Sequence, residues 1–447
     1  MENLHNKSLK EFRVSARDVI TFKLIRTKTD FDVAQEFHPE YTHQIFGERL
    51  IVFRYLKRLY FSEQIFGYSD LKIDIWYLAG SLSTYIAVKY STSVDPKVSK
   101  GVLPDDIYKL LSETFPYKYD RSLVDFSETF RNDYFAPYGV VRHTYHSSKD
   151  KRKFSVYYTE YGMSDFENFL NYHKRMESFL LFFVDGASAI STEDTQWCYY
   201  TLFEIIESSG SAPPKFAFVG YMTVYKFYAY PASIRPRLSQ VLVLPPFRNS
   251  GHASELLMTF YRDFVHVPNV RDITVEDPSD DFRRLRDFLD CKRCLEQDEI
   301  MDLLNCDGKK GNPVSSKDTS YKSAYLLFRN KAQQLLKINR CQAKRVYEIL
   351  CLYLLPRTSE AVVSFRNALL RRTVADYKRA RVEVIGDRSE DGRNVGAHSV
   401  PHGPLRVMCS ELADECFESQ VNERVNADLL SYQTVVVKLD CMSNRTS

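Results

Sequence analysis

The sequence of 447 residues lacks any apolar run long enough to cross a membrane. Its longest run, Phe179 to Val184, is far shorter than the roughly 20 residues that span a bilayer. The first residues, MENLHNKSLKEF, contain no apolar signal core. The nine cysteines are few for this length and odd in number, so they favour reduced thiols over a disulfide framework. We therefore expect a cytosolic or nuclear protein with no membrane partner.

A strong charge of either sign is also missing. Lys and Arg number 61 and Asp and Glu 58, which gives a formal net charge of +3. Because no global basic field exists, we expect no direct DNA binding. The chain is 44% hydrophobic and contains 30 Tyr and 30 Phe, enough to bury a large core. A wholly disordered or fibrous chain is thereby excluded, and internal repeats are absent from the sequence.

The N-terminal and central parts show mainly strand patterns. β structure is predicted over 14–28 and 70–92, the latter as a hairpin that turns at Ala79 to Ser81. The apolar and basic stretch from Ile51 to Phe61 favours a short amphipathic helix. A capping box at Ser164 to Glu167 predicts the start of a helix. Further strands are predicted over Trp197–Glu207, Phe216–Tyr230 and, as a buried central strand, Val241–Leu244.

After Cys306 the pattern becomes helical. Helices are predicted over Asn339–Leu355 and, with many arginines, over 365–381; a solvated face explains that basic run better than a nucleic-acid site. Residues 386–404 indicate a linker, and 405–447 have a weak mixed pattern. We predict an N-terminal β-rich domain over 1–125, a central domain over 126–290, a helical extension over 291–385, and a linker with an uncertain tail over 386–447.

The segment from Val241 to Pro278 contains the strongest functional signal. A buried strand ends at Pro246, a polar loop from Arg248 to Ala253 follows, and this loop opens a helix. Free backbone N–H groups at a helix N-terminus, with the helix dipole, form an anion site that suits a pyrophosphate. The loop matches neither the Walker A pattern nor the dinucleotide fingerprint. Its Arg-x-x-Gly-x-Ala pattern resembles the coenzyme A loop of the GCN5-related N-acetyltransferase (GNAT) superfamily.

Longer blocks resemble one family within it, the catalytic subunits of type B histone acetyltransferases. These blocks follow the family's order: HPEYTHQIFG at 38–47, AGSLST at 79–84, VGYMTVY at 219–225, RPRLSQ at 235–240, ITVEDPS at 273–279 and AKRVYEIL at 343–350. The resemblance implies a GNAT-type mixed central sheet flanked by helices. It also implies acetyl transfer from acetyl-CoA to lysine Nε on the tail of newly made histone four, with histone two A as a second candidate. A WD-repeat histone chaperone is the implied partner, and nucleus and cytoplasm are the implied locations.

The resemblance also assigns roles to residues. Glu276 matches the general base, with Asp277 and Asp185 nearby; family members usually have Glu where Asp185 stands. The pantetheine arm is expected to pair with the backbone of Val241, Leu242 and Val243. The pyrophosphate is expected to lie on Arg248, Asn249, Ser250, Gly251, His252, Ala253 and Ser254. The histone tail is expected to contact Tyr225, Lys226, Phe227 and Trp197.

The chemistry of the residues agrees with this assignment. Acyl transfer needs a neutral amine, whereas free lysine has a pKa of about 10.4. A carboxylate at a strand end can accept the lysine proton, and a neighbouring Asp277 raises the basicity of Glu276. If both substrates bind together, direct attack requires no covalent enzyme intermediate, so no nucleophile is assigned. We also expect no metal: Cys291, Cys294 and Cys306 lack a fourth ligand with zinc spacing, which favours ordinary thiols.

The sequence departs from the family between Phe46-Gly47 and Phe66-Gly67. Family members carry a short acidic stretch here that grips the histone tail, whereas this chain has eighteen residues, and only Glu48 and Glu63 remain as candidate acidic contacts. Two alternatives therefore stay open: an acetyltransferase for another amine, and a non-catalytic histone-binding scaffold.

Overall fold

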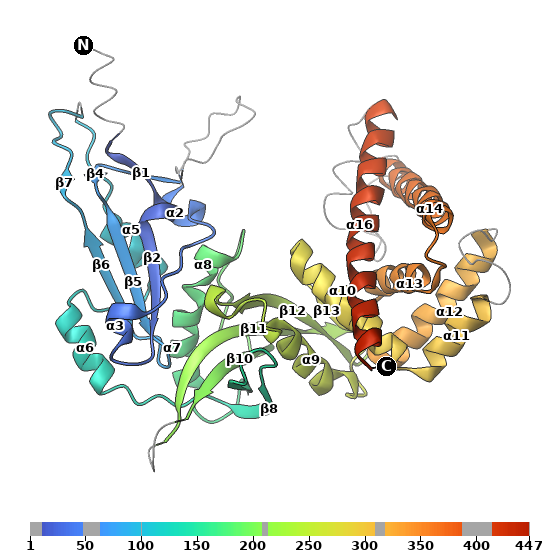
Figure 1. Ribbon diagram of the computed structural model, residues 1–447, viewed down its shortest axis with the longest axis horizontal. Helices are drawn as coiled ribbons and strands as arrows, with labels where there is room; N and C mark the ends of the chain where they lie inside the picture. The colour runs from blue at the N-terminus through green and yellow to red at the C-terminus, as the bar shows by residue number, and fades with distance from the viewer. Residues whose placement is uncertain are drawn as a thin grey trace. The chain divides into compact units, whose positions relative to one another are not determined.

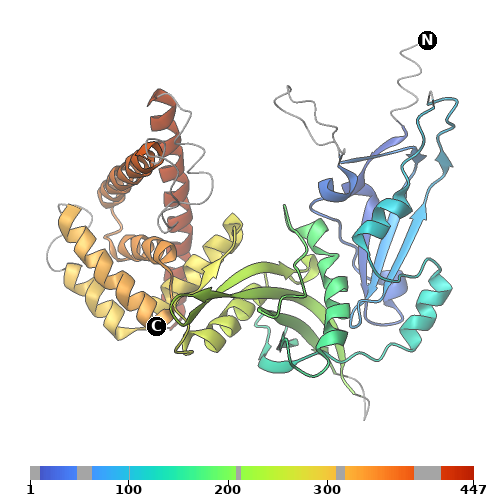
Figure 2. The same cartoon turned by 180° about the vertical axis from the view of Figure 1, so that it is seen from behind.

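The computed structural model describes residues 11–47, 63–99, 101–207, 213–308, 318–386 and 414–446. The chain forms two compact units, Met1–His266 and Val267–Ser447 (Figures 1 and 2). The fold class is confirmed: the N-terminal region is β-rich, a central sheet follows, and the C-terminal part is helical. The predicted domain boundaries stay a prediction. No helix within the described ranges is long and apolar enough to cross a membrane.

The N-terminal part of the first unit is built on a three-stranded sheet in the order β2–β5–β6. Strands β2 (Ile20–Ile25) and β5 (Lys72–Leu78) are parallel, and β5 is antiparallel to β6 (Thr84–Lys89). The predicted hairpin is therefore confirmed. Continuous β structure over 14–28 is wrong, because the short helix α2 (Ala16–Val19) separates β1 (Arg13–Ser15) from β2. The smaller elements are β3 (Gln64–Phe66), β4 (Tyr68–Ser69), β7 (Thr92–Ser93), α3 (Asp30–Val33), α4 (His43–Phe46), α5 (Ile107–Thr114) and α6 (Leu123–Arg131).

The central sheet of the first unit contains five antiparallel strands in the order β12–β11–β10–β9–β8. Their bounds are Ser233–Val243, Lys215–Ala229, Trp197–Ile206, Lys153–Glu160 and Val140–His146. The strands predicted to begin near 197 and 216 are confirmed, and the apolar run at Val241 lies at the end of β12. A fully buried central strand is wrong there, because burial alternates: Leu242 and Leu244 are buried, whereas Val241 and Val243 are half-buried.

Helices cover both faces of this sheet. Tyr199 and Tyr200 are consecutive on β10, so their buried side chains point to opposite faces. Tyr199 contacts Phe169 of α7 (Phe166–Glu177), with ring centroids 4.8 Å apart. Tyr200 contacts Phe260 of α9 (His252–Val265) at 6.1 Å. The remaining helices of the unit are α8 (Leu180–Phe183) and the 3-10 turn η1 (Pro245–Phe247).

The predicted capping box at the start of α7 does not form. Asp165, and not Ser164, is the N-cap residue, and it lies in the left-handed region with φ +60°. Its side chain makes no capping hydrogen bond. A capping box needs extended backbone at the cap, so the left-handed turn prevents it. The helix itself forms as predicted, and one face of it, including Phe166 and Phe169, is buried.

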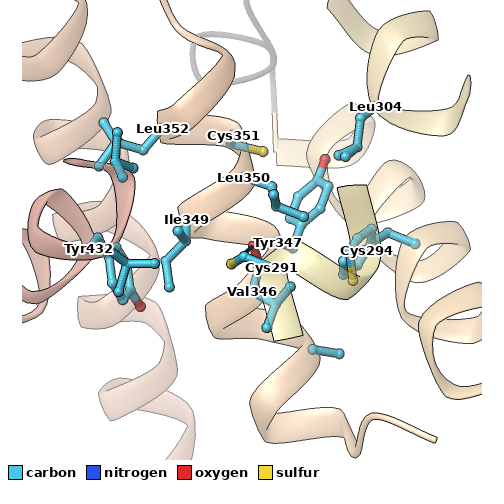
Figure 3. Close-up of a cluster of buried hydrophobic side chains, with 14 of the residues drawn as sticks. Cys291, Cys294, Leu304, Val346, Tyr347, Ile349, Leu350, Cys351, Leu352 and Tyr432 are labelled. Carbon is cyan, nitrogen blue, oxygen red and sulfur yellow. Dashed lines mark hydrogen bonds between the residues drawn. The ribbon is translucent and has the colours of Figure 1, made fainter. Parts of the chain in front are cut away.

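The second unit is a helical bundle built around one apolar core, part of which Figure 3 shows. The predicted helix over Asn339–Leu355 is confirmed as α13 (Arg340–Leu354), and the side chain of Asn339 caps it. The predicted basic helix lies inside the longer α14 (Ser359–Gly386). The tail with a weak pattern forms helix α16 (Asp414–Thr446). The other elements are β13 (Thr274–Val275), α10 (Asp280–Leu295), α11 (Asp298–Gly308) and α12 (Asp318–Leu336).

Helix α16 is anchored by buried polar contacts as well as by apolar packing. Tyr432 donates a hydrogen bond to Glu348 at 2.9 Å. Arg345 bridges the fully buried Asp287 at 2.7 Å and Asp428 of α16 at 3.2 Å. These contacts explain why the weak hydrophobic pattern did not reveal the role of this segment: its charged positions also face the bundle.

Several predictions fall on residues outside the described ranges. They are the amphipathic helix over Ile51–Phe61, the acidic contact Glu48, and the linker beyond residue 386.

Candidate active site

The loop after β12 has the conformation that an anion site requires. Asn249 and Gly251 both have positive φ, +58° and +87°. Gly251 is the N-cap residue of α9 and has no side chain that could accept a hydrogen bond from the first turn. A Cβ at Gly251 would meet no protein atom within 4 Å. The N-terminal N–H groups of α9 are therefore free to bind an anion that approaches across this glycine.

Arg248 is held at the mouth of this loop by two contacts. Its Nε donates a hydrogen bond to the carbonyl oxygen of Val243 at 3.0 Å. Its terminal nitrogen pairs with the carboxylate of Glu40, and both side chains are partly exposed. Sequence reasoning missed Glu40 as a partner of the loop, because the two residues are 208 positions apart.

His252 lies at the start of α9, but its side chain points into the core. The residue is 1% exposed, and its ring lies 4.4 Å from that of Phe154. Tyr145 OH and His252 Nδ1 are 2.7 Å apart, which fixes this ring. Burial lowers the pKa of His252 to about 4, so the imidazole is neutral. Only the backbone of His252 is therefore placed to contact a phosphate, whereas Ser250, Ala253 and Ser254 lie partly exposed around the turn.

Strand β12 brings the predicted pantetheine backbone next to this loop. Val241, Leu242 and Val243 pair with Met222, Tyr221 and Gly220 of β11. The register shifts just before this segment, where Gln240 opposes Thr223 but Leu238 opposes Val224. Ser239 is thus the extra residue of a β-bulge, a feature that commonly re-aims side chains beside active sites.

The aromatic residues predicted to contact the substrate lie together on β10 and β11. Trp197 is directly opposite Tyr225, with ring centroids 4.9 Å apart, and Phe227 lies 4.4 Å from Tyr225. Tyr225 OH donates to Asp194 at 2.7 Å. Lys226 instead pairs with Glu160 at 2.8 Å, which lowers the pKa of that carboxylate. Asp194 and Glu160 were not predicted.

Two of the predicted acidic residues, Glu63 and Asp185, differ in how accessible their carboxylates are to a substrate. Glu63 accepts hydrogen bonds from the backbone and hydroxyl of Thr42, so its carboxylate is already engaged. Asp185 follows α8, and its side chain is 69% exposed. Its contact is His43, 3.6 Å away. Asp185 is therefore the more accessible of the two acids.

Glu276 and Asp277 follow β13 in the second unit, and both are exposed. Ile273, the residue just before β13, is held by three hydrogen bonds. Its N–H donates to Lys337 O at 2.8 Å, and its carbonyl accepts from Asn339 at 2.8 Å and from Arg286 at 3.1 Å. Asp277 has a positive φ of +28°. Ser279 then caps α10 through Phe282 N–H at 3.3 Å. The acidic pair thus stands on a short, rigid connection between a strand and a helix.

The pair Cys291 and Cys294 lies in the apolar core of the second unit. Both thiols are free, and burial raises the pKa of each. The described residues contain no group of three or more His, Cys, Asp or Glu side chains that could hold a metal ion.

Comparisons with known proteins agree with this architecture. Residues 12–185 match the family model described as "Histone acetyl transferase HAT1 N-terminus". The mouse (Mus musculus) histone acetyltransferase type B catalytic subunit is 35% identical over 383 residues, which cover 85% of this chain and 84% of the relative. The rat (Rattus norvegicus) protein is 34% identical over 423 residues, with 92% and 93% coverage. The human (Homo sapiens) protein is 35% identical over 385 residues, with 85% and 84% coverage.

The mixed α/β fold and these matches define the class of protein, an acetyltransferase with a GNAT-like fold. The chain belongs to the family of histone acetyltransferase type B catalytic subunits. It is therefore an enzyme of the histone acetyltransferase class, and acetyl-CoA is its co-substrate. The residues present fit that co-substrate, because the open N-terminus of α9, the unobstructed Gly251 and the Arg248 guanidinium supply donors for a pyrophosphate.

Proposed function

We propose that this enzyme acetylates lysine Nε on the tail of newly made, free histone four, with histone two A as a second substrate. The observation that carries the proposal is Glu276, an exposed carboxylate on a fixed strand end, in a chain that belongs to this family. A WD-repeat histone chaperone is the proposed partner. We also propose that the enzyme works in the nucleus and cytoplasm and does not bind DNA directly.

In the proposed mechanism Glu276 acts as general base in a ternary complex. It accepts the proton of the lysine ammonium, directly or through water. The neutral amine then attacks the thioester carbonyl, a new C–N bond forms, and the C–S bond breaks. Coenzyme A leaves as a thiolate, which takes up the second proton that the nitrogen releases as it becomes an amide. No covalent enzyme intermediate is formed.

Further groups support this chemistry in the proposal. Asp277, next to Glu276, adds a second carboxylate beside the proposed base. Asp185 is a third acidic group that attracts the lysine. The backbone of 248–254 and the Arg248 side chain hold the pyrophosphate, and Val241–Val243 pair with the pantetheine arm. Trp197, Tyr225 and Phe227 contact the aliphatic part of the peptide.

A specific observation favours a second candidate, an acetyltransferase for another amine. Glu63, one of two acidic residues expected to grip the histone tail, is engaged by Thr42. Lys226 is likewise paired with Glu160. A substrate that does not need an acidic grip would be compatible with both contacts.

An acetyl-transfer assay on a substrate panel separates the two candidates. The purified chain is incubated with labelled acetyl-CoA and histone four tail, histone two A tail, polyamines or unrelated lysine peptides. The proposal predicts the largest kcat/KM for the histone four tail and a mass increase of one acetyl group on lysine. A polyamine or an unrelated peptide as the best substrate would favour the second candidate. No transfer to any amine would contradict both.

A further inference from the structure

The segment Val184–Ser191, here called the strap, is tied down by side chains from three different elements. Gln44 of α4 donates to Ala187 O at 3.0 Å. Gln240 of β12 donates to Ser188 O at 2.8 Å. Glu177 of α7 accepts the Ile190 N–H at 2.9 Å. The strap carries Asp185 near its start, so these three contacts hold the backbone that follows this residue.

Of the three anchoring side chains, Gln240 is the one that belongs to the strand proposed to bind the cofactor. It is 9% exposed and directly precedes Val241, the first residue of the backbone proposed to pair with pantetheine. It is also the first residue after the bulged Ser239. One side chain therefore links the cofactor strand to the segment that bears Asp185.

The surroundings of Gln240 fix which way its amide faces. Its Oε1 lies 3.4 Å from the hydroxyls of Tyr221 and Thr223, both of which can donate. Its own backbone N–H donates to Thr223 Oγ1 at 3.1 Å. The amide nitrogen is left to donate to the Ser188 carbonyl at 2.8 Å, because the amide oxygen carries no hydrogen and can only accept. A carboxylate in place of the amide would face that carbonyl with a repulsive oxygen.

Glu177 supports the same segment from the helix side. Burial raises its pKa, and the single backbone N–H of Ile190 partly offsets this. Glu177 is the last residue of α7, the helix that packs on the central sheet. Its hydrogen bond to Ile190 therefore ties the strap to that helix.

From these contacts we infer that Gln240 is a positioning residue that couples the cofactor strand to the strap and thereby places Asp185 for the lysine substrate. The inference rests on the proposed function, because Asp185 matters only if the enzyme acetylates a lysine. Gln240 does not contact either substrate in this account. It acts through Ser188 and the strap backbone.

The test compares Gln240→Glu with the control Thr223→Val. Gln240→Glu keeps the size of the side chain and replaces the donor to Ser188 with an oxygen that repels the carbonyl. Thr223→Val removes the partner of the Gln240 N–H and one of the two hydroxyls beside Gln240 Oε1. It leaves the donor to Ser188 and the second hydroxyl, that of Tyr221, in place. For Gln240→Glu we expect kcat/KM for the histone four tail to fall about tenfold or more, as for a lost buried hydrogen bond. Acetyl-CoA affinity by calorimetry should stay within about twofold, since the loop is untouched.

A second readout reports on the strap directly. Hydrogen exchange of the strap amides, Ile190 included, should become faster in Gln240→Glu and not in Thr223→Val. Gln44→Ala removes another anchor of the strap and should move exchange and kcat/KM in the same direction.

Each outcome has one reading. If the wild type transfers acetyl and folded Gln240→Glu has the same kcat/KM as the wild type, the inference is overturned and the proposed function stands. A fall in kcat/KM without faster strap exchange also overturns it, because the effect would then not pass through the strap. Absence of transfer by the wild type contradicts the proposed function, and the exchange data alone then decide whether Gln240 holds the strap.

Discussion

The guanidinium of Arg248 is paired with the carboxylate of Glu40, which lies 208 residues earlier in the chain. This contact links the N-terminal region to the loop proposed to bind pyrophosphate. It places a negative charge beside a site for an anion. Glu40 therefore both orients Arg248 and competes with the ligand for it.

We predict that Glu40→Gln strengthens acetyl-CoA binding severalfold at low ionic strength. Removing the carboxylate leaves the full charge of Arg248 to the pyrophosphate, and the gain should shrink at high salt as charges are screened. Calorimetry at two salt concentrations measures this. Glu36→Gln is a matched control, because Glu36 pairs with Lys23 and Lys72. Weaker binding by Glu40→Gln would mean that orientation of Arg248 outweighs repulsion.

Two substitutions of Gly251 should distinguish its effect on stability from its effect on acetyl-CoA binding. Its φ of +87° strains a β-branched residue far more than Asn, while a Cβ meets no protein atom. We expect Gly251→Val to lower both the thermal midpoint and acetyl-CoA affinity. Gly251→Asn should lower affinity with a smaller loss of stability. Thermal melts and calorimetry on both variants measure this, and normal affinity in either would remove the loop from the acetyl-CoA site.

The buried imidazole of His252 should make the first unit sensitive to acid. Its pKa is about 4 when folded and 6.5 in the unfolded chain, so only the unfolded state gains the proton between these values. The free energy of unfolding should therefore fall as pH drops from 6.5 to 4, by about 1.4 kcal/mol per pH unit for this group.

Denaturant titrations across this window test the contribution of His252. His252→Gln keeps an acceptor for Tyr145 OH and cannot titrate, so its slope should be smaller by one proton. His173, whose pKa is lowered to about 3 by burial, remains in the variant and contributes its own slope. An unchanged slope in His252→Gln would show that the ring is not held neutral.

The ion pair of Asp287 with Arg345 should contribute strongly to the second unit only as an intact pair. Asp287 is fully buried, so Arg345→Met leaves an uncompensated charge and should cost about 3–5 kcal/mol. The double variant with Asp287→Leu should recover much of this loss. The exposed pair of Arg357 and Asp440, 2.7 Å apart, is the control, and Arg357→Met should cost about 0–1 kcal/mol. Equal losses at both pairs, by denaturant titration, would contradict the argument.

The sequence was most informative where local pattern and tertiary role coincide. The apolar run at Val241 lies in a strand, and Gly251 has the left-handed conformation that its place before a helix requires. The loop and strand blocks therefore predicted both fold and family. At Ser164 local pattern failed, because a left-handed residue at Asp165 replaces the extended cap.

Contacts between distant segments were beyond the reach of sequence reasoning. Nothing in the local pattern of Glu40 points to Arg248, and nothing near Ser188 points to Gln240. The long helix α16 was missed because Asp428 and Tyr432 face polar partners in the bundle, Arg345 and Glu348, which breaks the apolar periodicity. Such partners are set by tertiary packing and not by neighbouring residues.

The pH–rate profile of Glu276→Gln tests the central claim, that this carboxylate is the general base. The variant keeps the size of the side chain but cannot accept the lysine proton. The account predicts that turnover at saturating acetyl-CoA with a histone four tail falls roughly 10²–10⁴-fold near neutral pH, with little change in acetyl-CoA affinity. The rate should partly recover as pH rises toward the lysine pKa of about 10.4. Asp277→Asn and the double variant serve as controls for rescue by the neighbour. Near-wild-type turnover of Glu276→Gln at neutral pH would contradict the account and move the role to Asp277 or Asp185.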